Sequence, residues 1–349
     1  MSDRTMTKRD VAPLAPTTAP FPEATEGRGR RVGPLLRDLG FTYGMVWVLV
    51  ALAIVAGFLY PGFWNIPNLN NLIYQAAPVG IVAVGMTFVI IGGGFDLSVG
   101  AVYAGGAVVY ASLADKVPLW LGFPITVAVV AIAGFANGLI ITKVRVSPFI
   151  ATLATASLFG GLVYLYSGPS PVVPTNKAFV GLGMDKWLGI WIPSFILLIF
   201  VIVASIVYSR SVYGRVVSAV GGNSEASRLA GIRVHRVWIS TYVISAVCAG
   251  IAGAIVASQT GVGQANIGAT VPLEAIAIVI IGGTSLLGGE GAIWRTVVGI
   301  LIWAIIKSLF GALALNSSAQ LLTTGAIVLI AVALDSTARR TLVGRLSRR

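Results

Sequence analysis

Long apolar segments recur along this chain and restrict it to one class of fold. The first runs from about Phe41 to Tyr60, and others follow as far as about Leu334. A helix needs roughly 20 apolar residues to cross the hydrocarbon core of a bilayer, whereas a membrane β-barrel shows short alternating strands. Only 10% of the residues are charged and 56% are hydrophobic, whereas about a quarter are charged in soluble domains. We therefore expect an all-α, polytopic integral membrane protein with about ten transmembrane passes.

The expected passes share apolar composition and are separated by short polar, proline-rich or glycine-rich segments. They lie at about residues 41–60, 72–91, 97–114, 119–142, 148–166, 191–208, 237–258, 273–281, 292–313 and 321–334. The first begins too late and lacks the small-residue exit of a cleavable signal peptide, so we expect a membrane helix there.

Basic residues indicate the topology. Most of the 24 Lys and Arg lie in the N-terminal segment, around Lys143 and Arg145, in residues 209–236, or near the C-terminus. The positive-inside rule places these regions in the cytoplasm beside anionic lipid, so we expect no nucleic-acid partner. We expect a disordered cytoplasmic segment at 1–34, a transmembrane domain at 35–336 and a basic cytoplasmic tail at 337–349. A single cysteine, Cys248, excludes an intramolecular disulfide.

Two glycine-rich stretches interrupt the apolar segments. Consecutive glycines are poor helix formers, so each stretch predicts a break in a transmembrane helix. Such a break is tolerated at membrane depth only where protein buries it or a polar cavity satisfies it. Paired interrupted segments also indicate a transport site between structural repeats. The expected hinge or break residues are Gly92, Gly93, Gly94, Gly282, Gly283, Gly288 and Gly289.

The two breaks are similar in sequence. The pentapeptide VIIGG occurs at residues 89–93 and again at 279–283, which fits either chance or a two-repeat architecture. Asp96, just after the first break, is the strongest intramembrane charge expected in the first half of the chain. It can cap the helix expected to begin at Leu97, line or gate a substrate path, or do both.

A polar and basic segment, residues 209–236, lies between the two apolar halves. Asn223 or Ser224 can cap a short helix, and Glu225 lies in its first turn, where a negative charge suits the helix dipole. Gly231 can adopt the left-handed conformation that ends the helix. The segment therefore predicts a short capped helix outside the membrane. On these signals alone, an ordinary solvated loop helix is the simpler interpretation.

Four motifs resemble those of one transporter family. Residues 93–100 (GGFDLSVG) resemble its GGIDLSVG motif, 147–153 (SPFIATL) its PFIxTLG motif, and 282–289 (GGTSLLGG) its GGTSLxGG motif. Residues 225–231 resemble the EAA-x-x-x-G signature of import-type ABC transporter permeases. The chain thus resembles, from about Phe41 to Asp335, the ribose/xylose/arabinose-type permeases of bacterial ABC sugar importers, within the branched-chain permease superfamily.

The resemblance has three departures. Phe95 stands where Ile is usual, and Ala154 stands where the second motif normally has Gly. A Trp294-Arg295 pair occupies a position that is usually small. Arg295 puts close helix packing after the second break in doubt, unless it pairs with Glu290 or faces the cytoplasm. Alternatively, the larger side chains would tune the substrate.

The resemblance implies a permease subunit that moves a sugar, delivered by a periplasmic binding protein, into the cytoplasm. It implies a homodimer in the bacterial inner membrane, with both termini cytoplasmic, and a separate ATPase subunit that binds ATP and Mg. This chain has no phosphate-loop motif and no catalytic or metal-binding constellation, so we expect it not to be an enzyme and to hold no cofactor or metal. The implied coupling helix for the ATPase contains Glu225, Ala226, Ser227 and Gly231.

A sugar needs partners that replace the water it loses on entering the protein. We expect these to be polar side chains at the breaks and along the path, binding weakly because the binding protein performs the capture. The candidates are Gln75, Asp96, Ser98, Asn137, Thr152, Thr284 and Ser285.

Three alternatives remain. A gradient-driven secondary transporter or channel would need intramembrane ion-coupling groups. A membrane enzyme or scaffold is supported by no catalytic constellation. A branched-chain amino acid-type ABC permease shares the architecture but matches the motifs less well. The ion-coupling candidates are few and lie near the predicted breaks: Asp96, Glu274, Glu290 and Lys307.

Overall fold

The computed structural model describes residues 32–316, 318–330 and 333, with the backbone alone for residues 32–42. The chain divides into two units, residues 1–42 and 43–349. Of the first unit, the structure describes the start of helix α1 (Val32–Leu59). Residues 1–31 of the predicted disordered segment and the basic tail at 337–349 lie outside the described residues. The other elements belong to the second unit.

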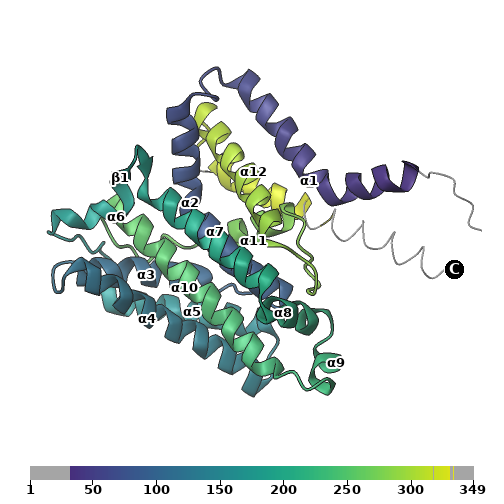
Figure 1. Cartoon of the computed structure of the whole chain (residues 1–349). Coiled ribbons are helices and arrows are strands. Elements are labelled where there is room, and N and C mark those ends of the chain that lie inside the picture. The colour runs from purple at the N-terminus through teal and green to yellow at the C-terminus, as the bar shows by residue number, and fades with distance from the viewer. Residues whose placement is uncertain (1–31, 317, 331–332, 334–349) are drawn as a thin grey trace, which may run out of the picture. The chain divides into compact units, whose positions relative to one another are not determined.

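Each expected pass coincides with an apolar helix (Figure 1). Within the described residues, six helices are long and apolar enough to cross a membrane: α2 (Ile66–Ile91), α4 (Leu119–Leu139) with the π-helical turn η1 (Ile140–Val144), α5 (Pro148–Ser167), α7 (Ile192–Arg210), α10 (Val234–Thr260) and α12 (Ile293–Ala312). Four apolar helical segments are shorter: Tyr43–Leu59 of α1, α3 (Val99–Leu113), α11 (Val271–Ile281) and Ser318–Ile330. The protein is therefore a helical, polytopic membrane protein, as predicted. The number of complete crossings stays a prediction.

Proline begins several of these helices. A proline in the first turn loses no hydrogen bond, because the first helical N–H groups have no partner within the helix. Its fixed φ angle also suits the start of a helix. The helices that begin in this way are α2, α5, α7 and α11, with Pro67, Pro148, Pro193 and Pro272 respectively.

Helix α10 packs against α2, α3 and α4. Small residues allow the close approach, since a methyl group at Gly106 would lie 2.6 Å from the Cα atom of Gly250 in α10. Within their apolar windows, 78% of the α2 residues and 67% of the α10 residues are buried, but only 17% of the α5 residues and 22% of the α7 residues. Helices α2 and α10 therefore form the core, whereas α5 and α7 leave apolar faces for lipid.

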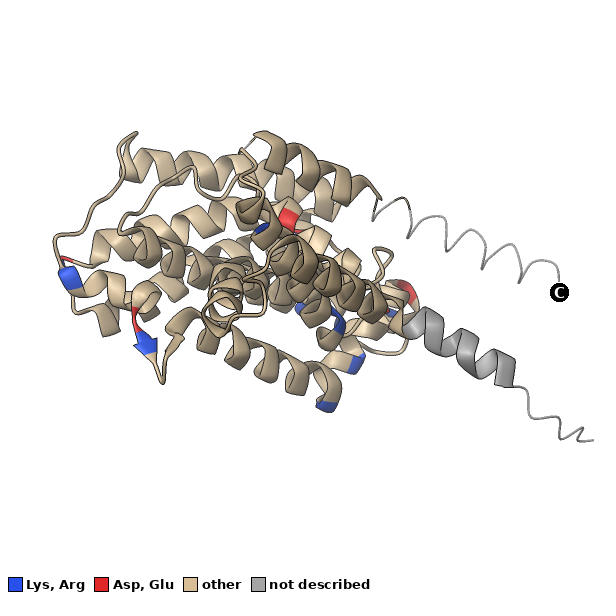
Figure 2. Cartoon of the chain, turned by 90° about the horizontal axis from the view of Figure 1, so that it is seen from above, with Lys and Arg blue, Asp and Glu red and all other residues tan. Residues whose placement is uncertain are grey.

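Short elements occupy the loops. Between α5 and α7 lie the 3-10 turn η2 (Lys177–Val180), α6 (Gly181–Met184) and an antiparallel hairpin of β1 (Lys186–Trp187) and β2 (Ile190–Trp191). Helices α8 (Val212–Gly222) and α9 (Ser224–Leu229) lie between α7 and α10. Figure 2 shows few charged residues along the middle of the helices, as expected for segments in lipid.

Candidate functional site

Both predicted breaks end a helix in the same way. At the end of α2, the amide of Gly93 donates to the carbonyl oxygen of Ile90 (3.0 Å), and the amide of Gly94 donates to that of Val89 (2.9 Å). At the end of α11, Gly283 and Thr284 make the equivalent bonds to Ile280 (2.7 Å) and Val279 (3.2 Å). This is the Schellman pattern, which needs a left-handed residue after the helix. Gly93 and Gly283 supply it, with φ angles of 82° and 84°.

The two breaks contact each other and the end of α8. The amide of Gly289 donates a 2.8 Å hydrogen bond to the carbonyl oxygen of Ile91. A methyl group at Gly288 would lie 2.8 Å from both the Cα atom of Gly93 and the carbonyl oxygen of Gly221. One at Gly221 would overlap the carbonyl oxygen of Ile91. We call this contact region, formed by Gly93, Gly221, Gly222, Gly288 and Gly289, the glycine junction.

Two aromatic side chains tie neighbouring helices to the breaks. The indole N–H of Trp238, in α10, donates to the carbonyl oxygen of Gly92 (2.9 Å). The hydroxyl of Tyr208, in α7, donates to the carbonyl oxygen of Gly291 (2.9 Å) and lies 2.8 Å from the hydroxyl of Ser218 in α8. Carbonyl groups that the breaks leave unpaired thus gain partners from two neighbouring helices, α7 and α10, which satisfies the requirement for broken backbone in a membrane protein.

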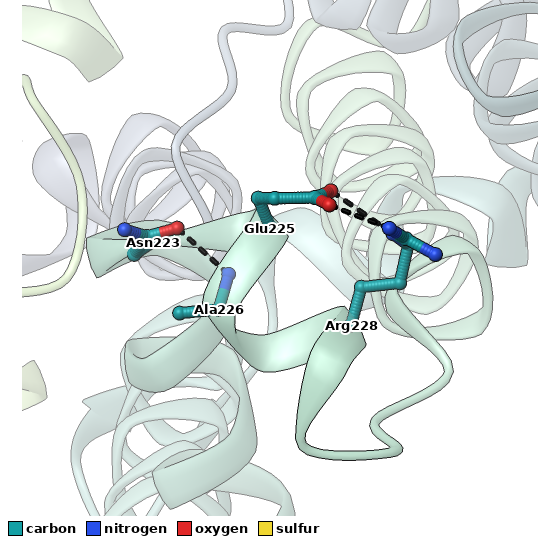
Figure 3. A network of polar contacts seen from close by, with 4 residues as sticks. All are labelled: Asn223, Glu225, Ala226 and Arg228. Atoms are coloured by element: carbon teal, nitrogen blue, oxygen red, sulfur yellow. Dashed lines mark hydrogen bonds and ion pairs between the residues drawn. The ribbon is translucent and has the colours of Figure 1, made fainter. Parts of the chain in front are cut away.

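Helix α9 follows α8 directly and has the predicted caps (Figure 3). The side-chain oxygen of Asn223 accepts a hydrogen bond from the amide of Ala226 (2.9 Å). Glu225 and Arg228 form an ion pair with a shortest distance of 2.5 Å, and this hydrogen bond lowers the pKa of Glu225. Gly231 has a φ angle of 85° and ends the helix.

The residues expected in the coupling helix differ in exposure. Glu225, Ala226 and Gly231 are exposed, whereas Ser227 is buried. The carbonyl oxygen of Ser227 accepts a hydrogen bond from the amide of Ile232 (3.0 Å), so Ser227 stabilises the end of the helix. Three of the four residues are thus available to a partner.

Asp96 is buried in a hydrogen-bonded cluster. One of its carboxylate oxygens accepts from the amide (3.1 Å) and the hydroxyl (2.6 Å) of Ser98, and the other accepts from the hydroxyl of Ser245 (2.9 Å). The amide group of Asn137 donates in turn to the Ser98 hydroxyl (2.6 Å). The following helix begins at Val99 rather than at Leu97, so Ser98 occupies the N-cap position. Asp96 lies two residues before this N-cap, and its carboxylate accepts from the amide of Ser98 rather than from an amide of the first helical turn.

The remaining path candidates lie in different places. Thr152 is buried, and its hydroxyl donates to the carbonyl oxygen of Pro148 (2.8 Å). Thr284 is buried with no partner for its hydroxyl within the described residues, and the Ser285 hydroxyl accepts from the amide of Leu287 (3.2 Å). Gln75 is exposed on α2, roughly 24 Å from the end of that helix at about 1.5 Å per residue. The structure does not bring the seven candidates into one site, and their role in a path stays a prediction.

The sequence reasoning missed two groups. Gly221 and Gly222 were not recognised as part of the junction, although a glycine pair at a helix end is a readable sign of close backbone contact. Asn71 was also missed, although Asn68, Asn71 and Gln75 recur at helical spacing on one face of the apolar α2.

Arg295 does not disturb the packing after the second break. Its guanidinium donates to the carbonyl oxygen of Gly283 (3.3 Å), and it forms no ion pair with Glu290 within the described residues. A methyl group at Gly282 would overlap the carbonyl oxygen of Arg295, so the two backbones are in close contact. The large residue is accommodated because its side chain reaches a backbone carbonyl while its backbone packs on glycine.

Comparisons with known proteins identify the family of the chain. Residues 68–332 match the family described as branched-chain amino acid transport system / permease component. The ribose import permease protein RbsC of Bacillus subtilis is 38% identical over 290 residues, which cover 82% of this chain and 90% of that protein. RbsC of Escherichia coli K12 is 35% identical (84% and 92% covered), and the L-arabinose transport system permease protein AraH of the same strain is 34% identical (84% and 90% covered). No solved structure matches. The chain therefore belongs to the branched-chain amino acid transport system / permease component family.

Proposed function

We propose that this chain is the membrane-spanning permease subunit of an ATP-binding cassette importer that moves a sugar into the cytoplasm. The printed names of its relatives, ribose import permease and L-arabinose transport system permease, support the sugar. The observation that carries the proposal is the path of the chain from α9 to the breaks. Helix α9 is exposed, and α8, directly before it, ends in the glycine junction.

This arrangement suits an input from outside the membrane. A partner that moves α9 also moves the C-terminal end of α8, because only Asn223 separates the two helices. Gly221 contacts the backbone of Ile91 and that of Gly289, one in each break. A displacement of α8 therefore acts on both broken helices together. In the proposed mechanism, closure of the ATPase dimer switches the gate between outward and inward states through this contact.

The proposed partners follow from that division of labour. The ATPase subunit binds ATP and Mg and docks on Glu225, Ala226 and Gly231 of this chain, which itself carries no cofactor or metal and is not an enzyme. A periplasmic binding protein delivers the sugar on the opposite face, and a second copy of the chain completes the path. Basic residues around α8, α9 and the start of α10 support a cytoplasmic position for that end of the helices. The proposed topology has both termini on the same cytoplasmic side of the inner membrane.

The structure gives less support to the alternative functions. A gradient-driven carrier needs an ion site, yet the carboxylate of Asp96 already accepts three hydrogen bonds. Glu274 and Lys307 neutralise each other at 3.3 Å. The description of the matched family favours a branched-chain amino acid as the competing cargo, so that class belongs in any test.

The decisive experiment is cargo-stimulated ATP hydrolysis in nanodiscs, with this chain, its co-expressed ATPase and the binding protein encoded beside it. The panel contains pentoses, hexoses, inositol and branched-chain amino acids. Stimulation by a sugar is the expected result. Stimulation by an amino acid alone would replace the cargo class, and uptake that needs an ion gradient but no ATPase would overturn the proposal.

A further inference from the structure

A pocket lined by both polar and apolar side chains lies beside the first half of α2, away from the glycine junction. Its volume is about 380 Å³, within the roughly 300–1,000 Å³ of small-molecule sites. Side chains from α2, α11 and α12 line it, together with Gln320 from the last apolar helix. These elements come from both halves of the chain.

A buried carboxylate, that of Glu274, connects two of the helices that line the pocket, α11 and α12. Glu274, in the first turn of α11, is only 7% exposed. One of its oxygens accepts from the hydroxyl of Thr270 (3.0 Å) and lies 3.3 Å from the ammonium of Lys307, and the other accepts from the indole N–H of Trp303 (3.2 Å). The carboxylate is thus held in place and its charge is compensated. An ammonium has three donors, and Glu274 uses one of those of Lys307.

Three other polar side chains of α2 and α12 that line the pocket have no protein partner in the part of the chain that the structure describes. Within the described residues, the side-chain amides of Asn71 and Gln75 and the hydroxyl of Ser308 make no hydrogen bond. All three residues line the pocket. Asn71 and Gln75 are exposed although they lie on a membrane-spanning helix. Unpaired amides facing lipid are costly, so this face needs water, cargo or protein against it.

The chemistry of these groups indicates a neutral, polyhydroxylated ligand. Each amide offers both donors and an acceptor, a pattern that suits adjacent hydroxyl groups. An amino acid zwitterion would instead need a free cation and a free anion, but Glu274 and Lys307 are paired with each other. Splitting the pair would leave the buried carboxylate of Glu274 without a compensating charge, which is costly. A sugar can hydrogen-bond to the spare donors of Lys307 without separating the pair.

We propose that this pocket is a sugar-binding station in the outer half of the translocation path, with Asn71, Gln75, Ser308 and Lys307 as its hydrogen-bonding groups. The proposal rests on the proposed function and assigns sugar binding to a specific pocket of this chain. The ion pair with Glu274 positions the ammonium of Lys307, and the hydrogen bond from the indole of Trp303 fixes the carboxylate of Glu274.

The test uses the complete complex of permease, ATPase and binding protein, with a Ser308→Cys substitution as a reporter. The native thiol, Cys248, is buried, so the parent complex gives the background of maleimide labelling. D-ribose, L-arabinose and L-leucine are added as probes. We expect a sugar to slow labelling of Ser308→Cys. In the Ser308→Cys background, Asn71→Leu or Gln75→Leu should raise the sugar concentration needed for half-maximal protection by about fivefold to tenfold. This factor corresponds to the loss of one hydrogen bond.

Asn70→Ala is the matched control, since Asn70 lies beside Asn71 but its amide bonds to Gly189 outside the pocket. It should leave protection unchanged. Stimulation of ATP hydrolysis by a sugar that gives no protection would overturn the pocket and leave the proposed function standing. Protection by leucine alone would overturn the ligand class. A thiol that is never labelled would show that the pocket is closed to water and would overturn its assignment to the path. Failure of every sugar to stimulate the complex would overturn both proposals.

Discussion

The amide of Gly289 donates a 2.8 Å hydrogen bond to the carbonyl oxygen of Ile91, and this bond joins the two broken helices of the chain. Ile91 is the last residue of α2, and Gly289 follows the end of α11. The two helix ends also share one hydrogen-bond pattern. Because Gly221 contacts both residues, the two breaks and α8 form one mechanical unit.

The first prediction concerns Gly221. Alanine at this position would overlap the carbonyl oxygen of Ile91 and lie 2.7 Å from the amide of Gly289. Overpacking of this kind typically costs about 1–3 kcal/mol, so Gly221→Ala should lower the thermal unfolding temperature in detergent. It should also weaken sugar-stimulated ATP hydrolysis. Gly222→Ala is the control, since its methyl group would meet its nearest neighbour at 3.9 Å. Equal behaviour of the two variants would contradict a role for the close backbone contact at Gly221.

The apolar helices and both breaks could be predicted from sequence because their causes are local. About twenty apolar residues suffice for a span, and consecutive glycines suffice to end a helix. The caps of α9 were predictable for the same reason, since Asn223 and Gly231 act within their own turns.

The contacts between distant segments could not be predicted in this way. The bond from Gly289 to Ile91 and the pairing of Glu274 with Lys307 depend on how the helices pack. Asp96 shows the same limit. A charge within an apolar sequence fits a path or a buried cluster equally well, and only the position of Ser245, in α10, distinguishes them.

The second prediction concerns Asp96. Asp96→Ala leaves the hydroxyls of Ser98 and Ser245 without their buried partner, and each such loss costs about 1–3 kcal/mol. Asp96→Asn keeps an oxygen for Ser98 and places an amide group that can donate to Ser245. We therefore expect a large fall in unfolding temperature for alanine and a small one for asparagine. If Asp96→Ala were as stable as the parent but inactive in transport, the carboxylate would instead serve the path.

The third prediction concerns pH. The carboxylate of Asp115 accepts from the amides of Thr175 (2.9 and 3.1 Å) and Asn176 (2.8 Å), and these bonds lower its pKa. Because the pKa of Asp115 is lower in the folded state, its ionised carboxylate stabilises the folded state. This contribution is complete at a pH above the unfolded-state pKa of about 3.9, and it is lost as the pH falls through the folded-state pKa. Amide exchange should therefore find Thr175 and Asn176 protected at pH 7 and less protected in strong acid.

The matched comparison for this loop is Asp115→Asn against Asp185→Asn, both at pH 7. Asp185 lies in the same loop, and its side chain accepts no hydrogen bond within the described residues. Asp115→Asn should increase exchange at Thr175 and Asn176, whereas Asp185→Asn should not. Similar exchange in both variants would mean that the carboxylate of Asp115 does not hold the loop.

The fourth prediction concerns the charge on α9. Glu225→Lys replaces the ion pair with two adjacent positive charges and puts a cation at a helix N-terminus, where it is unfavourable. Because Glu225 and Arg228 are exposed, membrane insertion and expression should be retained. Sugar uptake in proteoliposomes should fall while Glu225→Gln keeps most of it. Normal uptake by the lysine variant would show that this helix is not the coupling element.

The fifth prediction concerns the end of α9. Gly231 has a φ angle of 85°, but a methyl group there would meet no atom within 4 Å, so only backbone strain opposes a side chain. Asparagine tolerates the left-handed conformation better than other non-glycine residues, whereas a β-branched residue does not. Gly231→Val should therefore loosen the turn and reduce ATPase stimulation, and Gly231→Asn should retain it. Gly231→Asp combines a tolerated backbone with a new negative charge, so loss of uptake in that variant alone would indicate that the partner surface, rather than the turn, responds to this position.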